Sequence, residues 1–147
     1  MRHRLVLFGM SITNTSPASP TVVTVGGGTV TSHVADGIGR VSFHHPKGNS
    51  LPGALLRELA DTVTRVGADP GARVLLLSSG GTGPFCAGAS FDELVSISNT
   101  TEGQEFFSGF SRVILAMLRV PKFVLVRVQG RAAGGAVGLI AASDLSF

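Results

Sequence analysis

The pattern of apolar and polar residues becomes regular at Thr21, after a stretch rich in Ser, Thr and Pro. Two β-branched runs, residues 21–25 and 29–34, are separated by three glycines and predict a β-hairpin. Residues 39–44 predict a third short strand, which is closed by the turn residues Pro46-Lys-Gly-Asn-Ser50. We therefore expect the folded part of the chain to begin with three short strands.

Two later segments have the apolar spacing of amphipathic helices. Residues 54–66 place leucines and valines at intervals of three and four, and Asp69-Pro70-Gly71 ends the pattern. Residues 102–118 begin with two glutamates, which favour the positive end of a helix dipole, and Pro121 ends this segment. The predicted apolar face of the second helix consists of Phe106, Phe110, Val113, Ile114 and Met117.

Two continuous apolar runs, residues 73–78 and 123–128, are typical of strands that are buried on both faces. Short helices are expected near residues 91–95 and 136–143, and residues 144–147 begin what we interpret as a further strand. Strands that alternate with helices in this way predict an α/β fold with parallel strand pairing.

Composition excludes several classes of protein. The 147 residues suffice for one domain with its own core, and 44% hydrophobic with 14% charged residues excludes a disordered protein. No apolar run approaches the roughly 18 residues of a membrane span, so we expect no membrane partner. The net charge of +3 is spread along the chain without a basic cluster, so we expect no nucleic-acid partner.

The single cysteine, Cys86, cannot form a disulfide within the chain, which favours a reducing compartment and a cytoplasmic location. The first ten residues imitate a signal peptide, but their apolar stretch is short and residues 16–20 lack a clean cleavage pattern. We expect residues 1–20 to form a disordered N-terminal extension and residues 21–147 to form the domain.

Two glycine-rich loops, residues 79–89 and 130–135, share one layout: a buried strand, a turn of small residues, and a helix. Such turns expose backbone N–H groups, and two of them converging from separate loops would form an oxyanion hole. The alternative to an oxyanion hole is that these small residues only allow a helix to pack closely on its sheet. A dinucleotide site is less favoured, because Ala132 replaces the glycine that approaches the pyrophosphate.

Three segments resemble motifs of the enoyl-CoA hydratase/isomerase (crotonase) superfamily, in the same order. FCAGASFDEL at residues 85–94 resembles its F-x-A-G-A-D segment, and VQGRAAGGAVGLIAASD at residues 128–144 resembles its N-G-x-A-x-G-G-G segment. RVSFHHPKGNS at residues 40–50 is similar to the opening strand of the family, which ends in R-P-x-x-x-N. The resemblance implies a crotonase/ClpP-like spiral of ββα units, truncated to the N-terminal half of a family member.

Members of this superfamily bind acyl-coenzyme A thioesters and stabilise a thioester enolate between two backbone amides. By position, the resemblance assigns these catalytic amides to Ala89 and Gly135. It implies no metal and no cofactor other than the coenzyme A that the substrate carries, and it implies homotrimers or hexamers. The substrate-binding residues that it implies are Cys86, Ala87, Gly88, Ala89, Gly134, Gly135 and Gly138.

The resemblance implies enoyl-CoA hydration less directly than it implies acyl-CoA binding. Hydratases of the family carry one glutamate at the position of Gly138 and a second about twenty residues further on. Hydration needs a carboxylate to direct water and an acid to protonate the α-carbon. A catalytically incomplete acyl-CoA-binding or scaffold remnant is therefore the alternative, as are dehalogenases, decarboxylases and isomerases that have glycine at this position.

We interpret the remaining candidate residues as structural, each with a functional alternative. Asp92 and Glu93 are expected to be solvated charges of a short helix, and Asp144 to make a structural hydrogen bond. Cys86 is expected to be a small buried hydrophobe rather than a nucleophile. The other structural assignments are solvent-facing or turn positions for His44 and His45, a surface position for Arg131, and helix core for Phe106 and Phe110.

Overall fold

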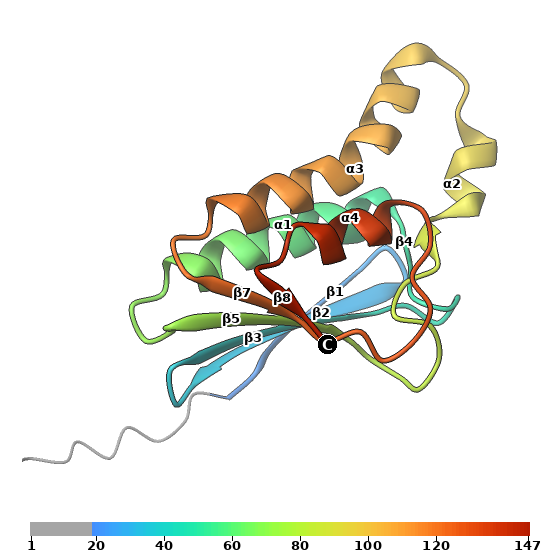
Figure 1. Cartoon of the computed structure of the whole chain (residues 1–147). Coiled ribbons are helices and arrows are strands. Elements are labelled where there is room, and N and C mark those ends of the chain that lie inside the picture. Colours follow the sequence, from blue (N-terminus) through green and yellow to red (C-terminus); the bar gives the residue numbers. More distant parts are fainter. Residues whose placement is uncertain (1–18) are drawn as a thin grey trace, which may run out of the picture.

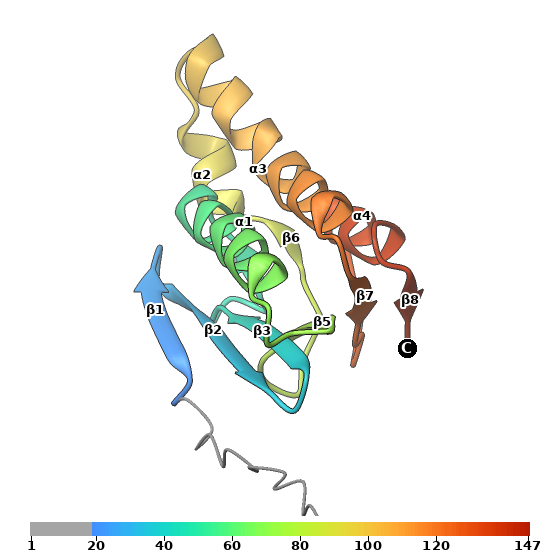
Figure 2. The same cartoon turned by 90° about the vertical axis from the view of Figure 1, so that its left-hand side faces the viewer.

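A six-stranded sheet carries three helices on one of its faces (Figures 1 and 2). The computed structural model describes residues 19–147, so the predicted N-terminal extension lies outside the described residues except for Ser19 and Pro20. Across the sheet, the order is β1 (Thr21–Val25), β2 (Gly28–Ala35), β3 (Ile38–His44), β5 (Val74–Ser79), β7 (Phe123–Val126) and β8 (Leu145–Ser146). A separate parallel pair consists of β4 (Ser50–Leu51) and β6 (Gly88–Ala89).

The predicted hairpin forms between β1 and β2, which pair in antiparallel fashion with Val25 opposite Gly28. Gly26 and Gly27, the two residues between them, have φ angles of +58° and +74°. Two consecutive residues with a left-handed backbone are typical of the two-residue hairpin turn, whose twist matches that of the flanking strands. Glycine adopts this conformation without strain. The glycine run therefore determines the position of this turn.

The remaining neighbours, β3, β5, β7 and β8, pair in parallel, as the alternation of strands and helices predicts. The connecting helices α1 (Gly53–Ala68), α3 (Thr100–Arg119) and α4 (Gly135–Ala141) lie over the same face of the sheet (Figure 1). Each begins beyond the carboxyl end of the preceding strand. Because these connections are parallel, both glycine-rich loops lie at the carboxyl ends of the strands, on the same side of the molecule.

The hydrophobic core lies between the sheet and this helical layer. Along β5, Leu75, Leu77 and Ser79 are buried, whereas the alternate residues are only half-buried. The prediction that the apolar strands are buried on both faces is therefore wrong, because no helix among residues 19–147 covers the second face (Figure 1). The largest buried side chains of the core belong to Phe43, Phe85, Leu51, Leu55, Leu56, Leu59, Leu75, Leu77, Met117 and Leu139.

A short helix, α2 (Phe91–Ser96), and the beginning of α3 project beyond the rest of the molecule (Figure 1). Both have the side-chain caps that define helix starts: Ser90 accepts from the Glu93 N–H, and Asn99 accepts from the Glu102 N–H. Glu102 in turn accepts from the backbone and hydroxyl of Ser98, which lowers the pKa of its carboxyl. Within residues 19–147, no helix combines the length and the apolar character needed to span a membrane.

Candidate functional site

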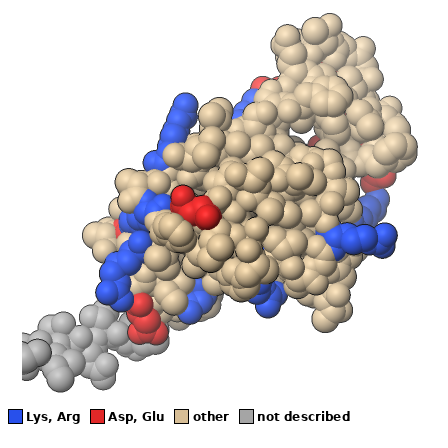
Figure 3. Space-filling view, in the orientation of Figure 1, with Lys and Arg blue, Asp and Glu red and all other residues tan. Residues whose placement is uncertain are grey.

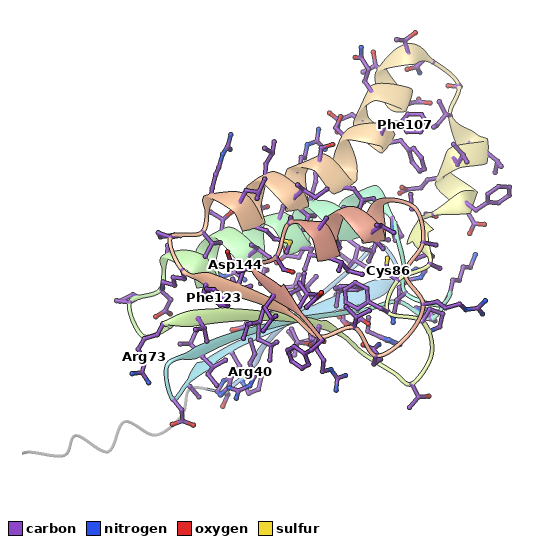
Figure 4. The ribbon with its side chains drawn as sticks, in the orientation of Figure 1. Arg40, Arg73, Cys86, Phe107, Phe123 and Asp144 are labelled. Carbon is purple, nitrogen blue, oxygen red and sulfur yellow. The ribbon has the colours of Figure 1, made fainter. Side chains whose placement is uncertain are left out.

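The two glycine-rich loops are hydrogen-bonded to each other. The N–H of Cys86 donates to the carbonyl of Arg131 at 3.3 Å, and the N–H of Ala133 donates to the carbonyl of Cys86 at 3.0 Å. These bonds make a parallel bridge between Cys86 and Ala132. Figure 4 shows Cys86 next to the beginning of α4. The structure thus brings together two segments that lie more than forty residues apart in the sequence.

Close approach of the two loops requires glycine at two positions. A Cβ atom on Gly130 would lie 2.6 Å from the carbonyl oxygen of Gly83, a distance that no side chain can accept. Gly88 has a φ of +101°, and a Cβ atom there would lie 3.2 Å from the carbonyl oxygen of Ala133. Small residues therefore serve the packing of one loop against the other, in addition to exposing backbone N–H groups.

The N–H of Ala89 points away from β4. Ser90, the next residue, donates its N–H to the carbonyl of Leu51 on β4 at 3.3 Å, and successive N–H groups of an extended strand point to opposite edges. The segment that precedes Ala89 is held between β4 and the second loop, because Ala87 donates to Gly48 while Cys86 pairs with Arg131. The Ala89 amide is therefore not used in the β4–β6 pairing.

Gly135 is the first residue of α4, where an N–H group has no partner within the helix. The next two amides donate to Ala133 and Gly134, at 3.2 and 3.1 Å, but the N–H of Gly135 has no acceptor among residues 19–147. Gly134 precedes it with a φ of +55°. A Cβ atom on Gly135 would lie 2.3 Å from the ring of Phe110, which confirms Phe110 as a core residue.

Gly138, the position of a glutamate in hydratases, faces the third helix. A Cβ atom there would lie 2.6 Å from Cδ1 of Ile114 on α3. Glycine at this position lets α4 and α3 approach each other closely. The residue supplies no carboxylate to the site, and a contact between Gly138 and a substrate stays a prediction.

Cys86 is a buried hydrophobe, as predicted. Its side chain is fully buried, and its Sγ accepts from the N–H of Gly88 at 3.4 Å. Burial in an apolar environment disfavours the thiolate and raises the pKa of the Cys86 thiol to about 11, although the Gly88 N–H opposes the shift. The thiol is therefore not a nucleophile at neutral pH.

Of the charged candidates, Asp144 and Arg131 follow the predictions and Glu93 does not. Asp144 accepts from the N–H of Val124 at 2.7 Å, which is the structural hydrogen bond expected, and Arg131 is exposed. Asp92 is exposed and forms an ion pair with Lys47. The prediction that Glu93 is merely a solvated charge is wrong, because its Oε2 accepts from the Gly53 N–H at the start of α1, at 2.7 Å. This bond ties α2, which follows the first loop, to the helical layer.

The two histidines have the predicted solvent-facing or turn positions. His44 is exposed, and His45 is only 8% exposed but lies in the turn that follows β3, where its carbonyl accepts from the N–H of Asn49. Its Nδ1 accepts from the N–H of Lys47 at 3.3 Å, next to the hydroxyl of Ser50. Burial lowers the pKa of His45, and the positive charge of Lys47 contributes to this. The prediction that Phe106 belongs to the helix core is wrong, because its side chain is only half-buried beside Phe107 and lies outside the core.

Sequence reasoning missed Asn49 as a residue of the site. Asn49 is 3% exposed, and its side chain connects the turn after β3 to the first glycine-rich loop. Its φ of +57° is a left-handed conformation, which asparagine adopts more readily than most residues. An asparagine between a glycine and a serine after a strand indicates a turn. That local pattern does not identify the loop to which the asparagine side chain binds.

The charged side chains do not concentrate at one place on the face shown in Figure 3. Lys and Arg residues lie mainly around its rim, interspersed with Asp and Glu, and leave the centre of the view uncharged.

The chain is similar to known proteins over most of its length. The family model described as enoyl-CoA hydratase/isomerase matches residues 33–147. The human mitochondrial enoyl-CoA hydratase domain-containing protein 2 is 31% identical over 110 residues, which cover 74% of this chain and 37% of the relative. The ethylmalonyl-CoA decarboxylase of Gallus gallus is 26% identical over 121 residues, which cover 81% of this chain and 40% of the relative.

Among solved structures, the enoyl-CoA hydratase from Bacillus anthracis superposes with a TM-score of 0.73 and 26% sequence identity. The match covers 80% of this chain and 46% of that chain. The present chain thus spans less than half the length of the relatives that it matches.

Proposed function

Because the chain belongs to the enoyl-CoA hydratase/isomerase family, we propose that it binds acyl-CoA thioesters and stabilises an enolate between the N–H groups of Ala89 and Gly135. The observation that carries this proposal is the hydrogen-bonded pairing of the two glycine-rich loops through Cys86 and Ala133. The relatives named above are CoA-thioester enzymes by description, which supports the substrate class.

Backbone amides suit this task because negative charge develops on the thioester oxygen when water adds to the β-carbon of an enoyl thioester or when the α-carbon of a thioester loses a proton. Two donors that are already oriented stabilise that charge without the reorganisation that water would need. Each donor of this kind contributes roughly 3–4 kcal/mol to the transition state. The unused N–H of Gly135 and the N–H of Ala89, which is directed away from β4, are the two groups available for it. The loop from Cys86 to Gly88, together with Gly134 and Gly138, would border the substrate.

The reaction we propose for the whole protein is hydration of an enoyl-CoA, with coenzyme A entering as part of the substrate. This step needs general acid–base groups in addition to the two amides. Gly138 cannot supply one, which favours a second candidate function, an acyl-CoA-binding or scaffold protein without hydratase activity. The two candidates share the binding site and differ only in the acid–base groups.

Acetoacetyl-CoA tests enolate stabilisation without requiring any acid–base residue, since it ionises in solution to an enolate with its own ultraviolet band. We expect the chain to bind acetoacetyl-CoA and to increase the bound enolate fraction. In 15N-labelled protein, the amide signals of Ala89 and Gly135 should shift on titration. Free coenzyme A, which has no thioester carbonyl, is the control ligand and should leave the Gly135 signal unmoved.

A pair of variants isolates the contribution of one amide. Gly135→Pro removes the N–H, and proline is tolerated at the first position of a helix because that N–H has no partner there. Gly135→Ala retains the N–H but brings the same Cβ atom toward Phe110, so it is the matched control. Both are compared in a Phe110→Ala background as well, which removes the Cγ, Cδ1 and Cδ2 atoms that the added Cβ would meet.

We expect the bound enolate fraction in Gly135→Pro to be about tenfold or more below that of Gly135→Ala, since one donor is lost. Equal enolate fractions in two folded variants would contradict the role of Gly135. Crotonyl-CoA then separates the two candidate functions: loss of enoyl absorbance supports hydration. Binding of acetoacetyl-CoA without any such loss supports the acyl-CoA-binding protein.

Assembly and location belong to the same proposal. We propose a homotrimer or hexamer in a reducing, cytoplasmic compartment, supported by the family and by the single cysteine. Light scattering of the purified chain measures its mass directly, and a monomer at all concentrations would contradict the assembly proposed for this chain.

A further inference from the structure

Asn49 uses both ends of its buried side-chain amide. It lies in the β3–β4 turn, residues 45–49, which its own backbone N–H closes by donating to the carbonyl of His45 at 2.9 Å. Its Oδ1 accepts from the N–H of His45 at 2.9 Å. Its Nδ2 donates to the carbonyls of Gly80 and Pro84, both at 2.9 Å. The side chain therefore has every donor and its acceptor satisfied inside the protein.

The two acceptors of Nδ2 lie at the beginning and in the middle of the first glycine-rich loop. Gly80 follows β5 directly, and Pro84 comes two residues before Cys86. A single side chain thus sets the separation between the two ends of this part of the loop. Buried hydrogen bonds of this kind rigidify their surroundings, because leaving a carbonyl without a partner costs free energy.

The backbone of the same turn holds the other end of the loop. The carbonyl of Gly48 accepts from the N–H of Ala87 at 3.1 Å, and β4 pairs with β6 so that Leu51 lies opposite Ala89. The β3–β4 turn consequently contacts the first loop at its beginning, its middle and its end. Displacement of this turn would move the Ala89 amide.

The second loop rests on the part of the first loop that Asn49 holds. Gly130 packs against the carbonyl of Gly83, which lies between the two acceptors of Asn49. Cys86, two residues after Pro84, pairs with Arg131 and Ala133. Asn49 therefore acts on both loops at once, although its hydrogen bonds are all to the first loop and its own turn.

We propose that Asn49 is a positioning residue that sets the spacing between the Ala89 and Gly135 N–H groups. This inference rests on the proposed enolate-stabilising function. Asn49 does not contact the substrate and acts only through the loops. A change in loop spacing should weaken the binding of the enolate, which needs both donors, more than the binding of the neutral thioester. Misplacement by about 1 Å is enough to reduce catalytic efficiency by roughly 100-fold in well-ordered sites.

The test is Asn49→Asp, which keeps the size of the side chain and the acceptor for the His45 N–H. It replaces Nδ2 with an oxygen that faces the carbonyls of Gly80 and Pro84, so two attractive contacts become repulsive. The matched control is Asn99→Asp, the same chemical change at the exposed N-cap of α3, where Asp and Asn are equally good. Asn49→Gly is a second variant that keeps the left-handed backbone and removes the whole side chain.

Each protein is titrated with acetoacetyl-CoA, and the dissociation constant and the enolate fraction at saturation are measured separately. We expect folded Asn49→Asp to lose about tenfold or more of the enolate fraction, with a smaller change in the dissociation constant. Asn49→Gly should lose less, because water can satisfy the two carbonyls, and Asn99→Asp should equal the wild type. A residue that only stabilises the fold would leave the saturated enolate fraction of folded protein unchanged.

The possible failures are distinguishable. Absence of any enolate in the wild type would overturn the proposed function, and with it this inference. A wild-type enolate that persists at full level in folded Asn49→Asp and Asn49→Gly would overturn the role of Asn49 alone. Loss of the fold in both variants would make Asn49 a folding residue and would also overturn the inference.

Discussion

Gly138 on α4 and Ile114 on α3 leave no room for a side chain between them. A Cβ atom on Gly138 would lie 2.6 Å from Cδ1 of Ile114, whereas the next nearest atom, Cγ1 of Ile114, would be 3.6 Å away. The obstacle is thus one methyl group at the end of a side chain. A glutamate at this position, as hydratases have, must first displace that methyl group.

The first prediction concerns Gly138→Glu, which we expect to lower the free energy of unfolding by about 1–3 kcal/mol through overpacking. Gly138→Ala should be close to neutral, because the better helix propensity of alanine, about 1 kcal/mol, offsets a small shift of Ile114. Urea denaturation measures both. Combining Gly138→Glu with Ile114→Ala should cost less than the sum of the two single changes, and strict additivity would contradict the contact.

The elements of the fold could be predicted from the sequence because their signals are local. Gly26 and Gly27 determine the β1–β2 turn, and Pro121 ends the longest helical pattern next to the observed end of α3 at Arg119. The predicted crotonase-like α/β fold is confirmed by the match to the enoyl-CoA hydratase from Bacillus anthracis. Asp144 could be assigned a structural hydrogen bond because it matches a carboxylate that is common in the family after the helix of the second loop.

The contacts of the site could not be predicted, because they join residues that are distant in sequence. No local pattern indicates that Glu93 binds the N–H of Gly53, or that Asn49 binds Gly80 and Pro84. The roles of the glycines have the same origin, since Gly135 and Gly138 are small because of Phe110 and Ile114 on another helix. Burial of His45 also depends on neighbours that only the fold supplies.

The second prediction is that Cys86 does not react with thiol reagents in the folded protein. With a pKa of about 11, about one thiol in a thousand is ionised at about pH 8, and the side chain is fully buried. We expect Ellman's reagent to leave the native protein unlabelled over hours. In about 8 M urea, which unfolds the chain, the reagent should react rapidly and stoichiometrically. Rapid labelling of the native protein at one thiol per chain would contradict the buried assignment.

The third prediction concerns Asp144 and Val124, which hold β8 against β7 by two bonds. The carboxylate accepts from the Val124 N–H at 2.7 Å, and the Asp144 N–H donates to the Val124 carbonyl at 2.9 Å. Asp144→Ala leaves a buried N–H without a partner and should cost about 1–2 kcal/mol. Asp144→Asn, which retains an oxygen acceptor, should cost less.

Hydrogen exchange locates the effect of the Asp144 change. The Val124 amide should lose protection in Asp144→Ala, while the amides of Cys86 and Ala133 in the paired loops keep theirs. Acetoacetyl-CoA binding should be unaffected, since Asp144 acts on the sheet. A large loss of binding with an unchanged free energy of unfolding would instead indicate a role of this carboxylate in the site.

The last prediction is a pH dependence of stability that originates at His45. Burial lowers the pKa of His45 below its usual value of 6.5 in the folded protein, opposed by a backbone hydrogen bond to Gly26. Below pH 6.5 the unfolded chain therefore binds more protons than the folded protein, and stability falls as pH decreases. The contribution of His45 to the free energy of unfolding is fully present above pH 6.5 and declines as pH falls toward the lowered pKa of the folded protein. The slope of the free energy of unfolding against pH stays below about 1.4 kcal/mol per pH unit.

Urea denaturation between about pH 5 and pH 8 covers this window. The carboxyl of Glu102, whose pKa lies below its usual 4.5, contributes only at lower pH and does not interfere. His45→Asn places an oxygen acceptor near the position of Nδ1 and removes the titration, so its stability should vary less with pH. His44→Gln removes a neighbouring positive charge that also lowers the pKa of His45, so it should reduce the pH dependence slightly but not abolish it. Equal slopes in His45→Asn and the wild type would show that another group binds the protons, because no other change separates the two proteins.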